Sequence, residues 1–279
     1  MTPGSKTIII TGASDGIGAA AARQLRARGH DLVLVGRDPG KTATVAAEID
    51  APFHVADYTD LAQVRALAAE LEDAYPRIDV LANNAGGIMG DRSVTRDGYE
   101  KTFQVNHLGG FLLTQLLLPT LTASNASVIQ TSSRAAKAFS AFDIDDLQNE
   151  NTYAPHRAYG NAKLANILFT RELDRRYADV GIAAASFHPG VVGTNFAHDT
   201  THFIRFAYHA PVVKNLLTTS PDKGASQLVW LAEGTPGADW RTGAYYEKRR
   251  AATSLPEAQD DDLARRLWDE SERMVTDSN

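Results

Sequence analysis

Cysteine is absent from the 279 residues, which excludes disulfide bonds, thiolate catalysis and zinc–thiolate sites. No apolar run reaches the length that a membrane-spanning helix requires. Met1 precedes the first predicted strand by only a few residues, so we expect neither a signal peptide nor a membrane anchor. The net charge is -6, and the basic residues 248–250 are an isolated triplet that we interpret as a solvated turn. We therefore expect a soluble cytoplasmic protein with no membrane and no nucleic acid among its partners.

The chain does contain enough apolar material for a large core. Hydrophobic residues make up 43% of the sequence and charged residues 22%, which is the composition of an ordinary globular protein. The simplest interpretation of this length and composition is a single α/β domain over residues 1–279.

Residues 7–29, TIIITGASDGIGAAAARQLRARG, predict a buried strand, a glycine turn and a helix. Gly12, Gly16 and Gly18 have no Cβ atoms, so the backbone can turn sharply and a pyrophosphate can approach the helix N-terminus. Their Gly-x3-Gly-x-Gly spacing differs from the general dinucleotide fingerprint. The segment therefore predicts either a dinucleotide site or glycines that merely tighten the turn.

Strand and helix patterns alternate along the rest of the chain. The predicted strands cover residues 8–10, 31–36, 52–56, 78–82, 126–131, 182–187 and 243–246, and the longer helices include residues 60–75, 99–122 and 257–274. This alternation predicts an α/β fold, namely a Rossmann-like doubly wound parallel sheet of about seven strands with helices on both faces.

Arg37 and Asp38 follow the second predicted strand, where this type of fold distinguishes NADP(H) from NAD(H). Arg37 suits the ribose 2′-phosphate of NADP(H), with Lys41 as a second cation, whereas an acidic side chain there would bind the 2′-hydroxyl of NAD(H). Asp38 is alternatively the N-cap of a helix that begins at Pro39. We favour NADP(H) over NAD(H).

Several motifs, taken in order, resemble the short-chain dehydrogenase/reductase family. They are TGxxxGxG at residues 11–18, NNAG at residues 83–86, the serine pair at residues 132–133, YxxxK at residues 159–163 and a Pro-Gly bend after the sixth strand. The FDIDDLQNENTY run at residues 142–153 and the tail with Leu263, Leu267 and Trp268 resemble the retinol-dehydrogenase-like group. The resemblance covers nearly the whole chain. It implies an NAD(P)-dependent enzyme that transfers a hydride between the nicotinamide and an alcohol or carbonyl compound.

The resemblance also implies which residues bind the cofactor. An aspartate at position 57 caps the adenine pocket in the family, although Asp57 could instead only close a turn. The implied set is Gly12, Ser14, Asp15, Gly16, Ile17, Gly18, Arg37, Asp57, Tyr58, Asn84, Ala85, Gly86, Tyr159, Lys163, Pro189, Gly190, Val192 and Thr194.

Tyr159 and Lys163 are four residues apart on a predicted helix, so the phenol and the ammonium share one face. A free tyrosine has a pKa of about 10, and a nearby cation lowers it toward neutrality. By the resemblance, Tyr159 is the catalytic acid or base, and Lys163 tunes it and holds the cofactor. Ser133, rather than Ser132, is the oxyanion partner, and Asn106 bends its helix and holds a water that leads to the lysine. By the same analogy, the helices from Tyr99 and Tyr159 are a candidate interface for a homodimer or homotetramer.

Residues 195–220 would be the substrate lid in this family. Their aromatic and apolar side chains indicate an apolar substrate, or they pack only on the lid's own helices. His198, His202 and His209 lack a carboxylate partner, so we expect no metal site.

Two other functions are alternatives to a dehydrogenase or reductase. A silent dinucleotide-binding sensor or scaffold usually lacks the tyrosine or lysine, and a sugar-nucleotide epimerase has TGxxGxxG spacing and a larger C-terminal domain.

Overall fold

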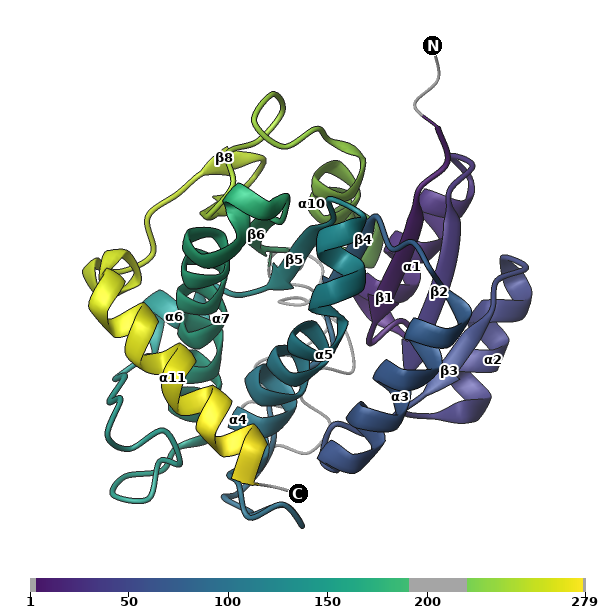
Figure 1. Ribbon diagram of the computed structural model, residues 1–279. Helices are drawn as coiled ribbons and strands as arrows, with labels where there is room; N and C mark the ends of the chain where they lie inside the picture. The colour runs from purple at the N-terminus through teal and green to yellow at the C-terminus, as the bar shows by residue number, and fades with distance from the viewer. Residues whose placement is uncertain (1–3, 191–219, 278–279) are drawn as a thin grey trace.

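The computed structural model describes residues 4–190 and 220–277, which form one sheet flanked by helices (Figure 1). The strand order is β3-β2-β1-β4-β5-β6-β7-β8, and neighbouring strands from β3 to β7 are parallel. The strands are β1 (Thr7–Thr11), β2 (Asp31–Gly36), β3 (Phe53–Val55), β4 (Val80–Asn83), β5 (Ser127–Thr131), β6 (Ala183–His188), β7 (Ala244–Glu247) and β8 (Arg250–Ala251). The predicted doubly wound parallel sheet is confirmed, and the predicted strands agree with β1 to β7 to within about two residues.

The short strand β8 is an addition to the predicted sheet. It pairs antiparallel with β7 through a hairpin whose two turn residues, Lys248 and Arg249, have φ values of 50° and 60°. Positive φ at both central residues is the geometry of a tight two-residue hairpin turn. The basic triplet is thus an exposed turn followed by the first residue of an edge strand.

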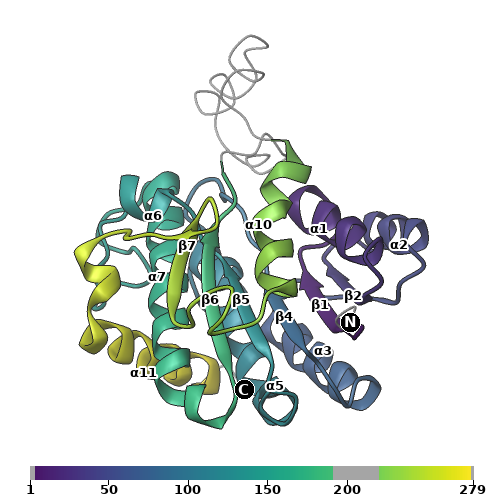
Figure 2. The ribbon, with the colours of Figure 1, turned by 90° about the horizontal axis from the view of Figure 1, so that it is seen from above.

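Helices cover both faces of the sheet, as the view from above shows (Figure 2). One face carries α1 (Gly16–Arg26), α2 (Pro39–Glu48) and α10 (Pro221–Glu233), and the other carries α3 (Leu61–Ala74), α5 (Gly109–Ala123), α7 (Pro155–Tyr177) and α11 (Asp261–Asp277). The shorter helices are α4 (Lys101–Phe103), α6 (Ala135–Ala138), η2 (Ala178–Val180) and η4 (Pro256–Gln259). Each face of the sheet therefore has its own apolar core. In β1, Ile9 faces one core, and Ile8 and Ile10 face the other.

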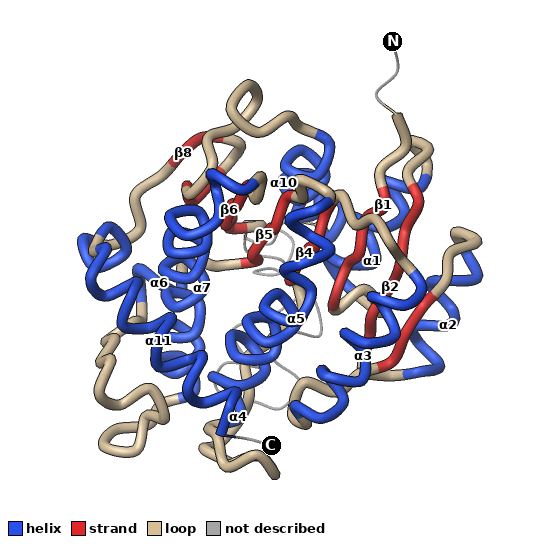
Figure 3. The backbone as a smooth tube through the Cα atoms, viewed as in Figure 1, coloured by secondary structure: helices blue, strands red, loops and turns tan. Residues whose placement is uncertain are grey.

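Two predicted helices differ from the observed ones. The helix predicted over residues 99–122 begins as α4, continues as the π-helix η1 (Gln104–Leu108) and becomes α5 (Figure 3). The helix predicted over residues 257–274 starts later, because Pro256–Gln259 is a 3-10 turn and α11 begins at Asp261. Apolar periodicity alone does not distinguish these local changes in helical hydrogen bonding.

Candidate active site

The glycine turn joins β1 to α1 and is too tight for side chains at two positions. Gly12 has a φ of +64°, and a Cβ there would lie 2.8 Å from Ala85 Cα. A Cβ on Gly18 would lie 2.3 Å from the Gly12 carbonyl oxygen. Asp15 is the N-cap of α1, and its carboxylate accepts from Gly16 N at 2.6 Å. Because glycines at the start of α1 have no side chains, a ligand can approach the backbone N–H groups there closely. This geometry fits a dinucleotide pyrophosphate.

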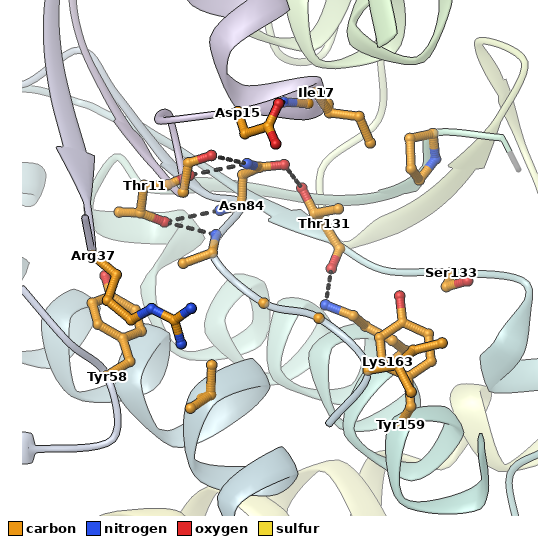
Figure 4. Close-up of a pocket in the computed structure, with 18 of the residues that line it drawn as sticks. Thr11, Asp15, Ile17, Arg37, Tyr58, Asn84, Thr131, Ser133, Tyr159 and Lys163 are labelled. Carbon is orange, nitrogen blue, oxygen red and sulfur yellow. Dashed lines mark hydrogen bonds between the residues drawn. The ribbon is translucent and has the colours of Figure 1, made fainter. Parts of the chain in front are cut away.

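Asn84 joins the ends of three neighbouring strands beside this turn (Figure 4). Its Nδ2 donates to the Thr11 carbonyl at 3.0 Å, and its Oδ1 accepts from Thr131 Oγ1 at 3.1 Å. Thr11 Oγ1 in turn accepts from the backbone N–H of Asn84 and of Ala85, each at 3.0 Å. The asparagine therefore fixes the carboxyl ends of β1, β4 and β5, which is the edge where ligands of open α/β sheets bind.

Arg37 and Asp38 have different surroundings at the end of β2. The Asp38 carboxylate accepts from Lys41 N at 2.9 Å and is the N-cap of α2, as one of the two sequence interpretations predicted. Arg37 is exposed and lines the cleft. Arg37 is thus the available cation, with Lys41 close to it on the same cleft.

Asp57 and Tyr58 line the cleft after β3. The Asp57 carboxylate accepts from Thr59 N at 2.9 Å, so it does close a turn, as the alternative interpretation held. Tyr58 is buried, and its ring lies so close to α5 that a Cβ on Gly109 would be 2.4 Å from Tyr58 Cδ2. Burial raises the pKa of the Tyr58 phenol.

Tyr159 and Lys163 face the same cleft from α7 (Figure 4). The Lys163 Nζ atom lies 5.4 Å from the centroid of the Tyr159 ring and donates to the Thr131 carbonyl at 3.1 Å. Lys163 is 2% exposed and Tyr159 is 5% exposed. Burial lowers the pKa of Lys163 to about 7, because the ammonium loses more hydration than the neutral amine does.

The two serines after β5 differ in what their hydroxyls contact. Ser132 is buried, and its Oγ donates to the Lys163 carbonyl at 2.7 Å. Ser133 is partly exposed on the cleft, where its Oγ accepts from Ala135 N at 3.1 Å. A hydroxyl has one proton to donate. Ser132 donates its proton to the Lys163 carbonyl on α7, whereas Ser133 only accepts from Ala135 N and can donate its proton toward the cleft.

Asn106 lies in the π-helix and holds the loop after β4. Its Oδ1 accepts from Gly87 N at 3.0 Å, and its Nδ2 donates to the Gly87 and Thr102 carbonyls, both at 2.9 Å. Gly86 has a φ of +154°, and a Cβ there would lie 2.4 Å from Asn106 Oδ1 and 3.1 Å from Lys163 Nζ. The predicted Asn106 and Lys163 therefore meet across Gly86.

The remaining predicted positions follow β6. Pro189 and Gly190 line the cleft, and Gly190 has a φ of +95°. Val192, Thr194 and the predicted lid at residues 195–220 lie outside the described residues, apart from Ser220 at the N-cap of α10.

Most of these groups border one cleft of about 1010 Å³. Its lining includes every predicted site residue in the described chain except Asn106 and Gly18, which support it from behind. Sequence reasoning missed Ile88, Met89, Arg134, Phe139, His156 and His188, which also line it. Arg134 and His188 lie close to or at the ends of β5 and β6, and His156 lies one turn before Tyr159, so position could have indicated these three. Ile88, Met89 and Phe139 lie further from the strand ends and carry no such signal.

Within residues 4–190 and 220–277, no group of histidine, aspartate or glutamate side chains is placed to hold a metal ion. His198, His202 and His209 lie outside those residues. The helices that the structure describes include none long and apolar enough to cross a membrane.

A doubly wound sheet with a glycine turn, a cation after β2 and a Tyr-Lys pair at one cleft defines a nicotinamide-dinucleotide oxidoreductase. Residues 6–204 match the family described as short chain dehydrogenase. The chain belongs to this family, the short-chain dehydrogenases/reductases, and to its retinol-dehydrogenase-like members. It is accordingly an NAD(P)-dependent oxidoreductase that acts on alcohol or carbonyl groups.

Its relatives include reductases and dehydrogenases. A Streptomyces sp. (strain C5) protein, named provisionally as the daunorubicin C-13 ketoreductase DnrU, is 42% identical, with 98% of this chain and 93% of that protein covered. Human retinol dehydrogenase 13 is 39% identical, with 97% and 84% covered. A crystal structure of an uncharacterised Mycobacterium paratuberculosis protein has a TM-score of 0.76 at 33% identity, with 97% and 93% covered. The Pseudomonas aeruginosa RhlG complex with NADP has a TM-score of 0.69 at 25% identity, with 86% and 93% covered.

Proposed function

We propose that this protein is an NADP(H)-dependent oxidoreductase that transfers a hydride between the nicotinamide and an apolar alcohol or carbonyl compound. The proposed catalytic residues are Asn106, Ser133, Tyr159 and Lys163. The observation that carries the proposal is the position of Lys163 Nζ, 5.4 Å from the Tyr159 ring on a cleft that Ser133 also lines.

In the reductive direction, the chain must handle the negative charge that grows on the carbonyl oxygen. The nicotinamide cofactor, when bound, supplies the hydride. Tyr159 donates a proton from its hydroxyl to the oxygen, and Ser133 donates a hydrogen bond to the same oxygen. Lys163 stabilises the phenolate that remains on Tyr159, because a cation in a desolvated site interacts strongly with a developing anion.

Asn106 and Thr131 hold this arrangement in place. Asn106 fixes the Gly86–Gly87 backbone that separates it from Lys163, and the Thr131 carbonyl holds the ammonium. With a pKa lowered to about 7, Lys163 exchanges protons readily near neutral pH. It can therefore return a proton to Tyr159 between turnovers.

The cofactor preference rests on the contrast between Arg37 and Asp38. Asp38 Oδ1 is engaged as the N-cap of α2, which gives the acidic candidate a structural role beside the ribose position. Arg37 projects beside the cleft and suits a 2′-phosphate. The likeness to RhlG, whose structure contains NADP, supports the same preference. The residues that would hold the cofactor are those predicted from the sequence, with Val192 and Thr194 among them.

The apolar part of the cleft supports the substrate class. Ile88, Met89 and Phe139 line it, and the Phe139 ring meets the His156 ring edge-on at 5.4 Å. Relatives named as a ketoreductase and as retinol dehydrogenases agree with a carbonyl or alcohol substrate.

We further propose a single domain over residues 1–279, with the lid at residues 195–220, and a cytoplasmic location.

The test is NADPH oxidation, followed by absorbance, with a panel of apolar aldehydes and ketones and with NADH in parallel. Tyr159→Phe should abolish turnover while the protein still binds NADPH. Tyr153→Phe is the matched control, because the Tyr153 hydroxyl donates to the Gly90 carbonyl at 2.9 Å and does not line the cleft. Cofactor binding without turnover of any carbonyl or alcohol would instead favour the sensor or scaffold.

A further inference from the structure

The carbonyl that holds Lys163 has a second donor, which comes from the same helix. Asn166 lies three residues after Lys163 on α7, and its Nδ2 donates to the Thr131 carbonyl at 3.3 Å and to the Asn106 carbonyl at 3.0 Å. Lys163 Nζ donates to that Thr131 carbonyl at 3.1 Å. One amide therefore links α7, the end of β5 and the π-helix that contains Asn106.

His107 fixes this amide from behind. Because Asn166 Nδ2 faces two carbonyls, its Oδ1 faces the His107 ring, 3.3 Å from Nδ1. Oδ1 only accepts hydrogen bonds, so the Nδ1 of His107 must bear the proton. The other ring nitrogen, Nε2, then accepts from Ser271 Oγ on α11 at 2.9 Å.

The surroundings of His107 keep its imidazole neutral and immobile. His107 and Asn166 are each 2% exposed, and Ser271 is 0% exposed. Burial lowers the pKa of His107 to about 4. The Asn166 hydrogen bond opposes this shift, and the Lys163 charge adds a smaller lowering. Aromatic rings pack around the imidazole, namely Phe103, Phe111 and Phe169.

We propose that Asn166, fixed by His107 and Ser271, is a positioning residue that sets where Lys163 and Asn106 stand relative to each other. This inference rests on the proposed function, because it assigns Asn166 a part in the same catalytic arrangement. The four-residue spacing of Tyr159 and Lys163 places two groups on one helix face, but it does not fix the lysine against β5. The Asn166 amide supplies that connection and ties it to the C-terminal helix.

The first experiment compares Asn166→Leu with Thr170→Val. Thr170 is a matched control, because it is 0% exposed one turn further along α7, and its hydroxyl donates only to the Asn166 carbonyl at 2.8 Å. Asn166→Leu should lower kcat by about tenfold to 100-fold, since small displacements of catalytic groups have effects of this size. The KM for the carbonyl substrate should change little. Thr170→Val should keep the wild-type kcat.

A purely structural role for Asn166 would give a different result. Both variants would then lose thermal stability, and both would keep the wild-type kcat, which would overturn the proposal. If Asn166→Leu does not fold, Ser271→Ala replaces it, because this variant removes only the hydroxyl that holds His107 Nε2. It should lower kcat by about fivefold, and an unchanged kcat would contradict the proposal.

A second readout does not depend on turnover. In protein labelled with ¹⁵N-histidine, His107 should show the Nδ1–H tautomer, with its signal assigned from a His107→Gln variant. An Nε2–H tautomer, or a protonated ring at pH 7, would overturn the chain of hydrogen bonds. If the wild-type protein turns over no carbonyl, the proposed function fails, and this spectrum still decides whether His107 and Asn166 are connected as proposed.

Discussion

Lys163 combines burial with a charge that the proposed chemistry needs. Its side chain is 2% exposed, and burial lowers its pKa from 10.5 to about 7. The unfolded chain therefore binds this proton more tightly than the folded protein does, which destabilises the fold at and below pH 7. The penalty is relieved as the pH rises from about 7 toward 10.5, where the lysine is neutral in both states.

We expect Lys163→Met to abolish turnover and to raise the free energy of unfolding by about 1–4 kcal/mol near neutral pH. The advantage over the wild type should shrink by about 1.4 kcal/mol per pH unit as the pH rises above the folded-state pKa. Urea denaturation of both proteins across this range measures the difference. Parallel stability curves, or a variant less stable than the wild type at neutral pH, would count against a buried ammonium.

Ser132 and Ser133 form a natural pair of variants for separating stability from catalysis. Ser133→Ala should lower kcat by about 100-fold or more, as removal of one oxyanion donor does, and should leave unfolding nearly unchanged. Ser132→Ala should lower the free energy of unfolding by about 1–2 kcal/mol, because its buried bond to the Lys163 carbonyl is lost. Steady-state kinetics and urea denaturation check both. A larger loss of kcat in Ser132→Ala would reverse the assignment.

At the scale of the elements, the start of α2 separates the two residues on which cofactor preference depends. Both residues line the cleft, but the Asp38 carboxylate caps the helix by accepting from Lys41 N at 2.9 Å. At the start of α2 the Asp38 carboxylate therefore stabilises the helix, and the Arg37 guanidinium is the group that we expect to bind a ligand.

Arg37→Ala should lower kcat/KM with NADPH by about tenfold to 100-fold and change it little with NADH, because a charge-assisted bond to a phosphate is lost. Asp38→Ala should cost about 1 kcal/mol of stability and keep the preference for NADPH. The ratio of kcat/KM for the two cofactors is the measurement. Improved use of NADPH in Asp38→Ala, with no effect of Arg37→Ala, would show that Asp38 governs the ribose pocket.

The elements also show where sequence reasoning succeeds and where it ends. Short apolar runs and glycines located β1 to β7, because strands buried on both faces have a simple pattern. The family resemblance indicated a bend at Asn106, but the apolar spacing did not predict the π-helix, since a change of hydrogen-bond register leaves no mark in that spacing. Asn166 and His107 were missed for a related reason. Both lie on apolar helices, and only the packing of α7 against η1 and α11 shows that their side chains meet.

At the scale of the whole molecule, the strand order brings the predicted site together. The ends of β1, β4, β5 and β6 meet at one edge, so residues from Gly12 to Gly190 reach the same cleft.

On the opposite side of α7, α11 packs through Trp268, whose ring lies 5.2 Å from Phe111 and 5.5 Å from Phe169. A homodimer or homotetramer stays a prediction. Any assembly through α5 and α7 has to accommodate α11 on those helices.

Trp268→Ala should lower the free energy of unfolding by about 3–5 kcal/mol, because the ring is 2% exposed and fills the space between α5, α7 and α11. Urea denaturation measures the loss. Leu263→Ala is the comparison variant on α11, since its side chain is only partly buried against the same core, and it should cost less. Equal losses would mean that Trp268 does not anchor the helix.

The measurement that tests the central claim most directly follows a deuterium atom from labelled NADPH into the product. With NADPH that carries deuterium in place of both hydrogens on the nicotinamide carbon that donates the hydride, mass spectrometry should find one label on the carbinol carbon of the alcohol formed by the wild type. Tyr159→Phe should bind the same cofactor and form no labelled alcohol. Alcohol without the label, or labelled alcohol from Tyr159→Phe at the wild-type rate, would contradict the proposed chemistry.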